Sequence, residues 1–139
     1  MSVTSGVYYK LLCPKANYKG IWFEPYMNWD YMRVVDEPGT GVSIKFLETS
    51  PGRYKIESAS SNWGGYTFFQ ADGSGIKLTS QAEATEWEVI PNANGHVFIR
   101  HSDGQSLLLA KNIFSDKHWL DCAGSYLGDP SWEWKLELV

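Results

Sequence analysis

The sequence is poor in cysteine, and this limits the sites that it can form. Its 139 residues include two cysteines, Cys13 and Cys122, with no CxxC pair and no Cys/His cluster at metal-ligand spacing. We therefore expect no metal site and no cofactor. Whether the two thiols pair or stay reduced is left open. A single domain of this length buries about 68% of its unfolded surface, which is enough for a core without disulfides or metals.

Excess positive charge and long apolar runs are also missing. The formal net charge is −4 and no basic stripe is visible, so nucleic acid is an unsuitable partner. No stretch approaches the roughly 20 apolar residues that span a bilayer, and we expect no membrane insertion. The N-terminus lacks a basic segment followed by an apolar run. We expect a cytoplasmic chain, with secretion by another route or after leader removal left open.

Signatures of catalysis are missing as well. The chain has three histidines, but no GxSxG elbow and no glycine-rich phosphate loop with its lysine and helix. No carboxylate pattern marks a glycosidase cleft. We therefore expect a protein that is not an enzyme.

Aromatic residues are abundant, at 15% of the chain, with seven Trp and eight Tyr. Many stand in short alternating runs such as "RYKIES", "WEVI" and "HVFIRH", separated by turn dipeptides such as Asp72-Gly73 and Asn94-Gly95. No segment sustains an apolar stripe at helical spacing. The pattern predicts an all-β protein.

The alternating pattern occurs three times, starting near Gly6, Gly52 and Gly95, about 45 residues apart. Each copy has a first strand, an Asn or Asp, an apolar triplet, a third strand and a closing apolar pair. The sequence therefore predicts one domain over residues 1–139, with repeats of approximately 6–51, 52–94 and 95–139 and twelve short strands. Expected core residues are Leu11, Ile44, Phe46, Ile56, Trp87, Val89, Ile99, Trp132 and Trp134.

This threefold repeat, with its closing "WEV" and "WEW" elements, resembles the β-trefoil superfamily over essentially the whole chain. The resemblance implies a six-stranded barrel capped by three hairpins. Strands one and four of each copy would form the barrel, and strands two and three the hairpin cap.

Candidate binding residues come from what the copies do not share. The second copy crosses its hairpin by "QADGSG", whereas the first uses "EPYMNWD" and the third "KNIFSDKHW". These longer connections combine an aromatic residue with Asn, Asp or His, a composition that suits the apolar face and hydroxyls of a sugar. The candidate carbohydrate-binding residues are Tyr26, Asn28, Trp29, Asp30, Asn62, Trp63, Asp116, His118, Trp119 and Asp121.

Structural roles remain open for several of these residues. Trp29 and Trp119 can instead cap the barrel, and Asp30 and Asp121 can end turns. The position of Trp63 is aromatic in two copies and Gly104 in the third, which a core position would not tolerate. We therefore expect Trp63 to be exposed, after an Asn62 that closes an Asx turn.

The chain looks similar to ricin-B-like and fungal fruiting-body lectins, which implies binding of glycans or glycoproteins as a monomer or homodimer. It departs from the ricin type at the closing Q-x-W motif, where the Gln positions read Val42, Thr85 and Pro130 and the first Trp is Ile44. No site can therefore be carried over residue by residue. The alternative is a Kunitz-type or mushroom trefoil protease inhibitor acting through loop 36–41 or loop 12–20. A third possibility is a protein-interaction module, as in fascin-like trefoils.

Overall fold

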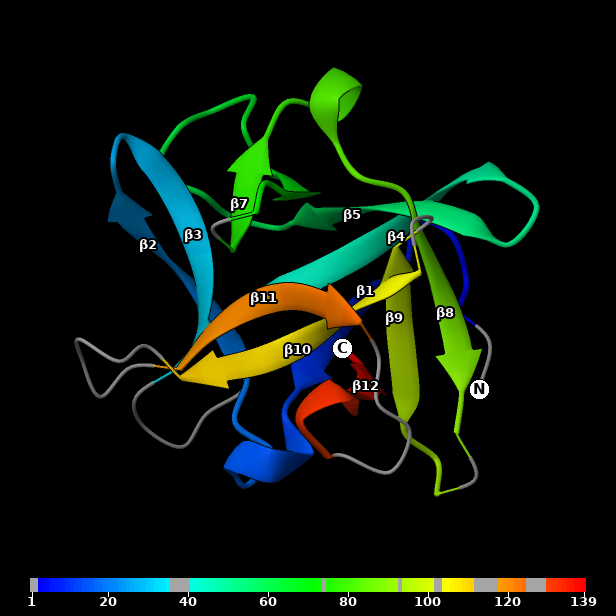
Figure 1. Ribbon diagram of the computed structural model, residues 1–139. Coiled ribbons are helices and arrows are strands. Elements are labelled where there is room, and N and C mark those ends of the chain that lie inside the picture. Colours follow the sequence, from blue (N-terminus) through cyan, green and yellow to red (C-terminus); the bar gives the residue numbers. More distant parts are fainter. Residues whose placement is uncertain are drawn as a thin grey trace.

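The computed structural model describes residues 3–35, 41–73, 75–92, 94–101, 104–111, 118–124 and 130–139. This part of the chain forms twelve strands and three short 3-10 helices (Figure 1). The strands are β1 (Tyr8–Leu12), β2 (Ile21–Tyr26), β3 (Trp29–Val34), β4 (Ser43–Ser50), β5 (Arg53–Ser58), β6 (Phe68–Ala71), β7 (Ile76–Thr79), β8 (Trp87–Pro91), β9 (Val97–His101), β10 (Gln105–Lys111), β11 (His118–Gly124) and β12 (Lys135–Leu138). The helices are η1 (Pro14–Ala16), η2 (Gln81–Glu83) and η3 (Pro130–Trp132).

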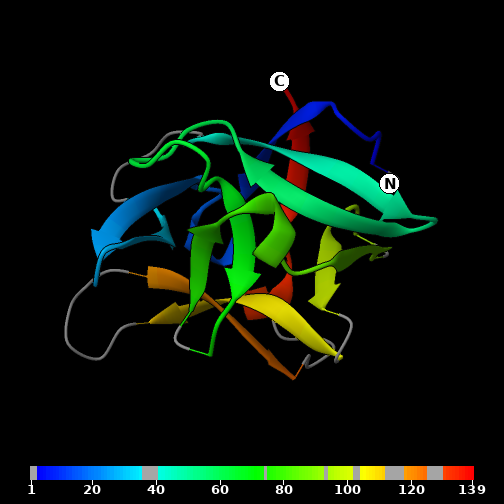
Figure 2. The same ribbon diagram turned by 90° about the horizontal axis from the view of Figure 1, so that it is seen from above.

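The strands form an antiparallel sheet that closes on itself. Strands β5, β6, β7, β3, β11, β10, β9 and β8 follow one another as neighbours, and Tyr54 of β5 pairs with Trp87 of β8 to complete the ring. Strands β4, β1 and β12 continue outward from β5, while β2 lies beside β3. The ladder between β1 and β12 brings the two ends of the chain together (Figure 2). The result is the all-β class that the alternating runs predict.

The core lies where the period-two pattern places it. Seven of the nine expected core residues are fully buried: Leu11, Ile44, Phe46, Ile56, Trp87, Ile99 and Trp134. Val89 is half-buried against the same cluster. Because alternate side chains of a strand point to opposite faces, one apolar set per strand is enough to fill the interior.

The sequence analysis places Trp132 in the closing strand of the third repeat, but the structure does not. It ends the helix η3 and is half-buried, and β12 begins three residues later at Lys135. Pro130 explains the difference, because proline cannot donate to a strand ladder and its fixed φ suits the first turn of a helix.

No helix in the described ranges is both long enough and apolar enough to cross a membrane.

Candidate functional site

The hairpin of β2 and β3 presents the first group of candidate residues. The sequence suggests a long connection over residues 24–30, but both strands continue until Tyr26 and Trp29 face each other as partners. The turn is reduced to Met27 and Asn28, whose φ angles are 52° and 68°. Two positive φ angles give the turn that matches the strand twist, and asparagine adopts this conformation readily. Tyr26 and Trp29 are therefore held side by side on a rigid ladder.

Direct cross-strand partners lie on the same face of a sheet. That face of the hairpin continues onto β7 and β11, and it includes residues that the sequence analysis did not select: Trp22, Tyr31, Arg33 and Lys77. The sequence signal that could have indicated the hairpin residues among them is the spacing of large side chains at every second position in both strands. From the hairpin tip inward, the cross-strand rows are Tyr26–Trp29, Glu24–Tyr31–Lys77 and Trp22–Arg33–Trp119.

Four aromatic rings gather at the tip of this face, and we call Tyr26, Trp29, Tyr31 and Tyr66 the aromatic cluster. The Tyr26 and Tyr31 rings meet edge to face at 5.9 Å, and Trp29 and Tyr66 do so at 5.7 Å. The Lys77 ammonium lies 4.0 Å from the Trp29 ring centre, within cation–π range. Tyr26 is 61% exposed and Tyr66 is 45% exposed, so both present apolar surface to solvent.

A second turn, residues 61–66, is fastened to the hairpin by Asp30. Asp30 is 1% exposed. One of its carboxylate oxygens accepts the backbone N–H of Asn62 and the other accepts the Asn62 side-chain amide, each at 2.7 Å. The Trp63 carbonyl in turn accepts the Tyr66 N–H at 3.2 Å and the Ser61 hydroxyl at 2.7 Å. The turn therefore holds Trp63 in place with its side chain 41% exposed, as its alignment with Gly104 suggests.

Asp30 and Asn62 anchor this turn, and their contact with a ligand stays a prediction. The Asp30 carboxylate is enclosed, and the Asn62 side-chain amide donates to it, while the expected Asx turn of Asn62 stays a prediction. The two residues position Trp63. The local spacing of "SSNWGG" cannot indicate this, because the partner lies 32 residues away in the chain.

Replacing Asp30 tests this positioning role. Asp30→Ala removes both acceptors, and hydrogen bonds to a charged group are worth about 1.5–3 kcal/mol. We expect the free energy of unfolding in urea to fall by about that amount. Asp30→Asn keeps one acceptor oxygen and should lose less. Wild-type stability in Asp30→Ala would show that the anchor is unimportant.

Tyr31, a member of the aromatic cluster, is hydrogen-bonded to Asp72. Its hydroxyl donates to the Asp72 carboxylate at 2.6 Å, and Lys77 lies 3.9 Å from the same oxygen. Burial, the hydrogen bond to Asp72 and the negative charge of Asp72 together raise the pKa of Tyr31 to about 12. The phenol is therefore a neutral donor at physiological pH.

The raised pKa of Tyr31 predicts an alkaline titration. The neutral phenol is favoured in the folded state, so its contribution to stability is fully present below about pH 10, the ordinary tyrosine pKa. That contribution is lost as the pH rises through the folded pKa of about 12. In an ultraviolet titration of tyrosinate, the last ionisation should disappear in Tyr31→Phe. A variant that instead lost an ionisation near pH 10 would contradict the assignment.

The second group of candidates lies on a strand rather than a loop. His118, Trp119 and Asp121 belong to β11, while Asp116 lies outside the described residues. Trp119 is half-buried in register with Arg33, and Asp121 accepts the N–H of Cys122 at 2.8 Å. Trp119 therefore extends the base of the hairpin face, away from its tip, while the adjacent His118 points to the opposite face of the strand. Contact of these residues with a ligand stays a prediction.

The described residues contain no cluster of three or more His, Cys, Asp or Glu side chains placed to hold a metal ion. Chemically, the surface around the aromatic cluster and Trp63 offers ring faces, hydrogen-bond donors and one lysine that is already paired.

No protein-family model matches the sequence, and no curated protein matches it. Solved structures do match the fold. Lysenin in complex with phosphocholine has 12% identity and a TM-score of 0.76 over 99% of this chain, which spans 46% of the lysenin chain. Soybean trypsin inhibitor has 10% identity and a TM-score of 0.76 over 100% of this chain and 95% of the inhibitor. The designed three-fold symmetric protein ThreeFoil has 16% identity and a TM-score of 0.61 over 95% and 99%. At these identities the likeness shows the fold alone, which is β-trefoil-like, as the repeat predicts.

Proposed function

We propose that the protein is a non-catalytic lectin that binds glycans through Trp63 and the aromatic cluster. The observation that carries this proposal is an exposed tryptophan on a turn that a buried carboxylate fixes in place. Leaving a large apolar side chain in water forgoes about 1.5–3 kcal/mol of burial free energy. A ligand that covers the ring recovers that free energy without the cost of ordering a mobile loop.

The chemistry of this surface suits a pyranose. Its C–H face packs on an indole or phenol ring, while its hydroxyls need donors and acceptors in fixed geometry. Trp63, Tyr66 and Tyr26 supply the rings, and the exposed Asn28 at the hairpin tip supplies an amide. Each such hydrogen bond contributes about 0.5–1.5 kcal/mol net, so a single site is weak. Affinity then depends on several contacts or several sites.

The proposal includes the finer division of the trefoil. We infer that β1, β4, β5, β8, β9 and β12 form a six-stranded barrel and that the other three hairpins form the cap. The paired backbone hydrogen bonds between Val97 and Trp134, at 2.8 and 2.9 Å, support closure of this ring just ahead of β12. On this division the Trp63 turn joins a barrel strand to a cap strand.

A protease inhibitor is the alternative function, since soybean trypsin inhibitor shares the fold over nearly its whole length. Of its candidate loops, residues 36–40 lie outside the described residues. Loop 12–20 is folded onto the body: it contains η1, the Cys13 N–H donates to the Lys19 carbonyl at 2.9 Å, and Lys15 donates to Ser131 at 2.7 Å. These contacts fix the loop, and its entry into an enzyme cleft stays a prediction.

A glycan array probed with the labelled chain tests the proposal. Phosphocholine belongs on the array because the lysenin structure contains it. We expect binding to a subset of saccharides and no inhibition of trypsin or papain. A silent array together with stoichiometric inhibition of either protease would favour the alternative.

A further inference from the structure

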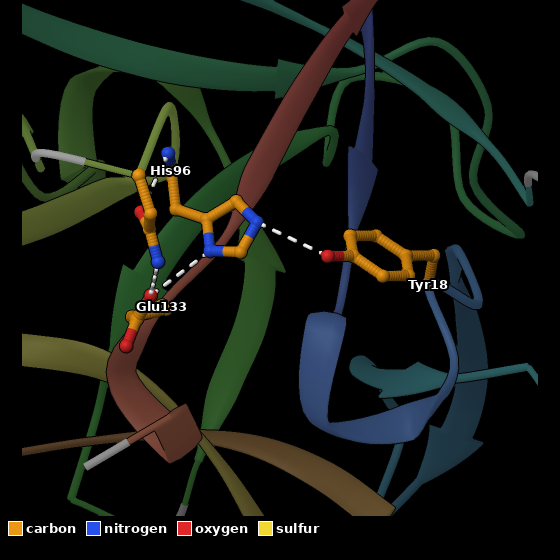
Figure 3. Close-up of polar contacts among 4 residues, drawn as sticks. Tyr18, His96 and Glu133 are labelled. Carbon is orange, nitrogen blue, oxygen red and sulfur yellow. Dashed lines mark hydrogen bonds and ion pairs between the residues drawn. The ribbon is translucent and has the colours of Figure 1, made fainter. Parts of the chain in front are cut away.

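A polar network fixes a second exposed aromatic residue, Tyr18, at the junction of the first and third repeats (Figure 3). The Tyr18 hydroxyl lies 3.3 Å from Nε2 of His96, and Nδ1 of His96 lies 2.9 Å from Oε1 of Glu133. The side-chain amide of Asn94 donates to the same Glu133 oxygen at 2.7 Å. Glu133 is itself buried and His96 is half-buried, whereas Asn94 and Tyr18 are exposed, so the network reaches from the body to the surface.

The network sets the direction of each hydrogen bond. Hydrogen bonds from Asn94 and His96 lower the pKa of Glu133, so its side chain is a carboxylate near neutral pH. A carboxylate at Nδ1 requires the proton of a neutral imidazole to be there, which leaves Nε2 as the acceptor for the Tyr18 hydroxyl. The phenol is thereby fixed, and its oxygen lone pairs remain available to accept.

Tyr18 combines an exposed side chain with a backbone conformation that tyrosine rarely adopts. The side chain is 46% exposed, and Lys135 lies 5.6 Å from the ring centre. Asn17 and Tyr18 both have positive φ angles, 56° and 58°. Asparagine adopts this conformation readily, but a tyrosine in it costs of order 1–3 kcal/mol, and such residues concentrate at ligand sites. The fold accepts this cost while leaving the ring in solvent.

The two exposed aromatic turns correspond between repeats. Asn17-Tyr18 of the first copy aligns with Asn62-Trp63 of the second. Each turn is fixed by a buried carboxylate from the copy that precedes it in cyclic order. Asp30 of the first copy holds the turn of the second copy. Glu133 of the third copy holds the turn of the first copy through His96. The third copy has Gly104 at this position and therefore no ring to present.

We propose that Tyr18 is the platform of a second saccharide subsite, so that one chain binds glycans at two places, the Trp63 turn and the Tyr18 turn. His96 and Glu133 are positioning residues, since they act on the ligand through the orientation of Tyr18. The subsite takes the same ligand class as the Trp63 turn and so rests on the proposed function. The pairing of two weak sites on one rigid body raises affinity for branched or clustered glycans.

Two-dimensional amide NMR can observe the two turns separately. The labelled full chain is titrated with the methyl glycosides of galactose, glucose, mannose and N-acetylglucosamine, each to tens of millimolar. At least one glycoside should shift the amides of residues 15–20 and those of residues 61–66, with a separate dissociation constant for each set. Tyr18→Ala should abolish the first set of shifts and spare the second, and Trp63→Ala should do the reverse.

Tyr18→Phe is the matched variant, because it keeps the ring and removes the hydroxyl that His96 accepts. It should weaken binding at residues 15–20 by about threefold to tenfold, the effect of one hydrogen bond, and leave residues 61–66 unchanged. Shifts confined to residues 61–66 in the wild type would overturn the second subsite and leave the proposed function standing. Shifts in neither set, with any of the four glycosides, would overturn both. If Tyr18→Ala fails to fold, the wild-type titration and Tyr18→Phe decide the matter.

Discussion

Trp63→Ala should weaken glycan binding by between about tenfold and a hundredfold while leaving the fold intact. The loss corresponds to about 1.5–3 kcal/mol, the free energy of covering one large apolar side chain. Because Trp63 is 41% exposed, its truncation should change the free energy of unfolding by less than about 1 kcal/mol. Calorimetric titration with the strongest glycan from the array, alongside urea unfolding, measures both effects.

Trp22 provides a matched control. It is also 41% exposed, but it lies at the other end of the hairpin and stacks on Phe23 at 4.6 Å. Trp22→Ala should leave affinity unchanged. Equal losses in the two variants would show that the effect follows from general loss of surface tryptophan rather than from the Trp63 turn.

Trp87→Ala should be the most damaging single substitution, lowering the free energy of unfolding by about 3–5 kcal/mol. Trp87 is fully buried, and it is the residue through which β8 pairs with Tyr54 of β5 to complete the ring of strands. Truncation therefore removes core contacts and leaves a cavity at the closure. The expected loss in free energy of unfolding is a large share of the 5–15 kcal/mol that stabilises a typical domain.

Trp132→Ala is the comparison for this prediction, because it removes the same side chain from a half-buried position on η3. Its cost should be clearly smaller. Urea unfolding monitored by circular dichroism measures both variants. A loss below about 1 kcal/mol for Trp87→Ala would contradict the placement of this residue at the centre of the core.

The fold could be predicted because its signal is local and repeated. Alternating runs such as that around Ile56 predict the strands, and the spacing of Gly6, Gly52 and Gly95 predicts their grouping into three copies. Burial of Leu11, Ile56 and Ile99 then follows from the two-residue period of a strand. The alternating pattern predicts the wrong element where one residue has a strong preference of its own. Pro130 favours the first turn of a helix, so the last closing element begins as a 3-10 helix instead of a strand.

The sequence selects Tyr26, Trp29 and Trp63 of the candidate site, but not Tyr31, Tyr66 or the contacts that hold these rings. The exposure of Trp63 follows from comparing aligned positions, since Gly104 occupies one of them. The bonds from Asp30 to Asn62 and from Glu133 to His96 join residues 32 and 37 positions apart. No local pattern encodes such partners, because they meet only when distant segments of the chain pack together.

A crystal structure of the chain soaked with the strongest glycan from the array is the most direct measurement. It should show a pyranose ring with its C–H face on the indole of Trp63 and its hydroxyls near the hairpin tip at Asn28. Density for the sugar elsewhere on the body, with Trp63 uncovered, would contradict the proposed site.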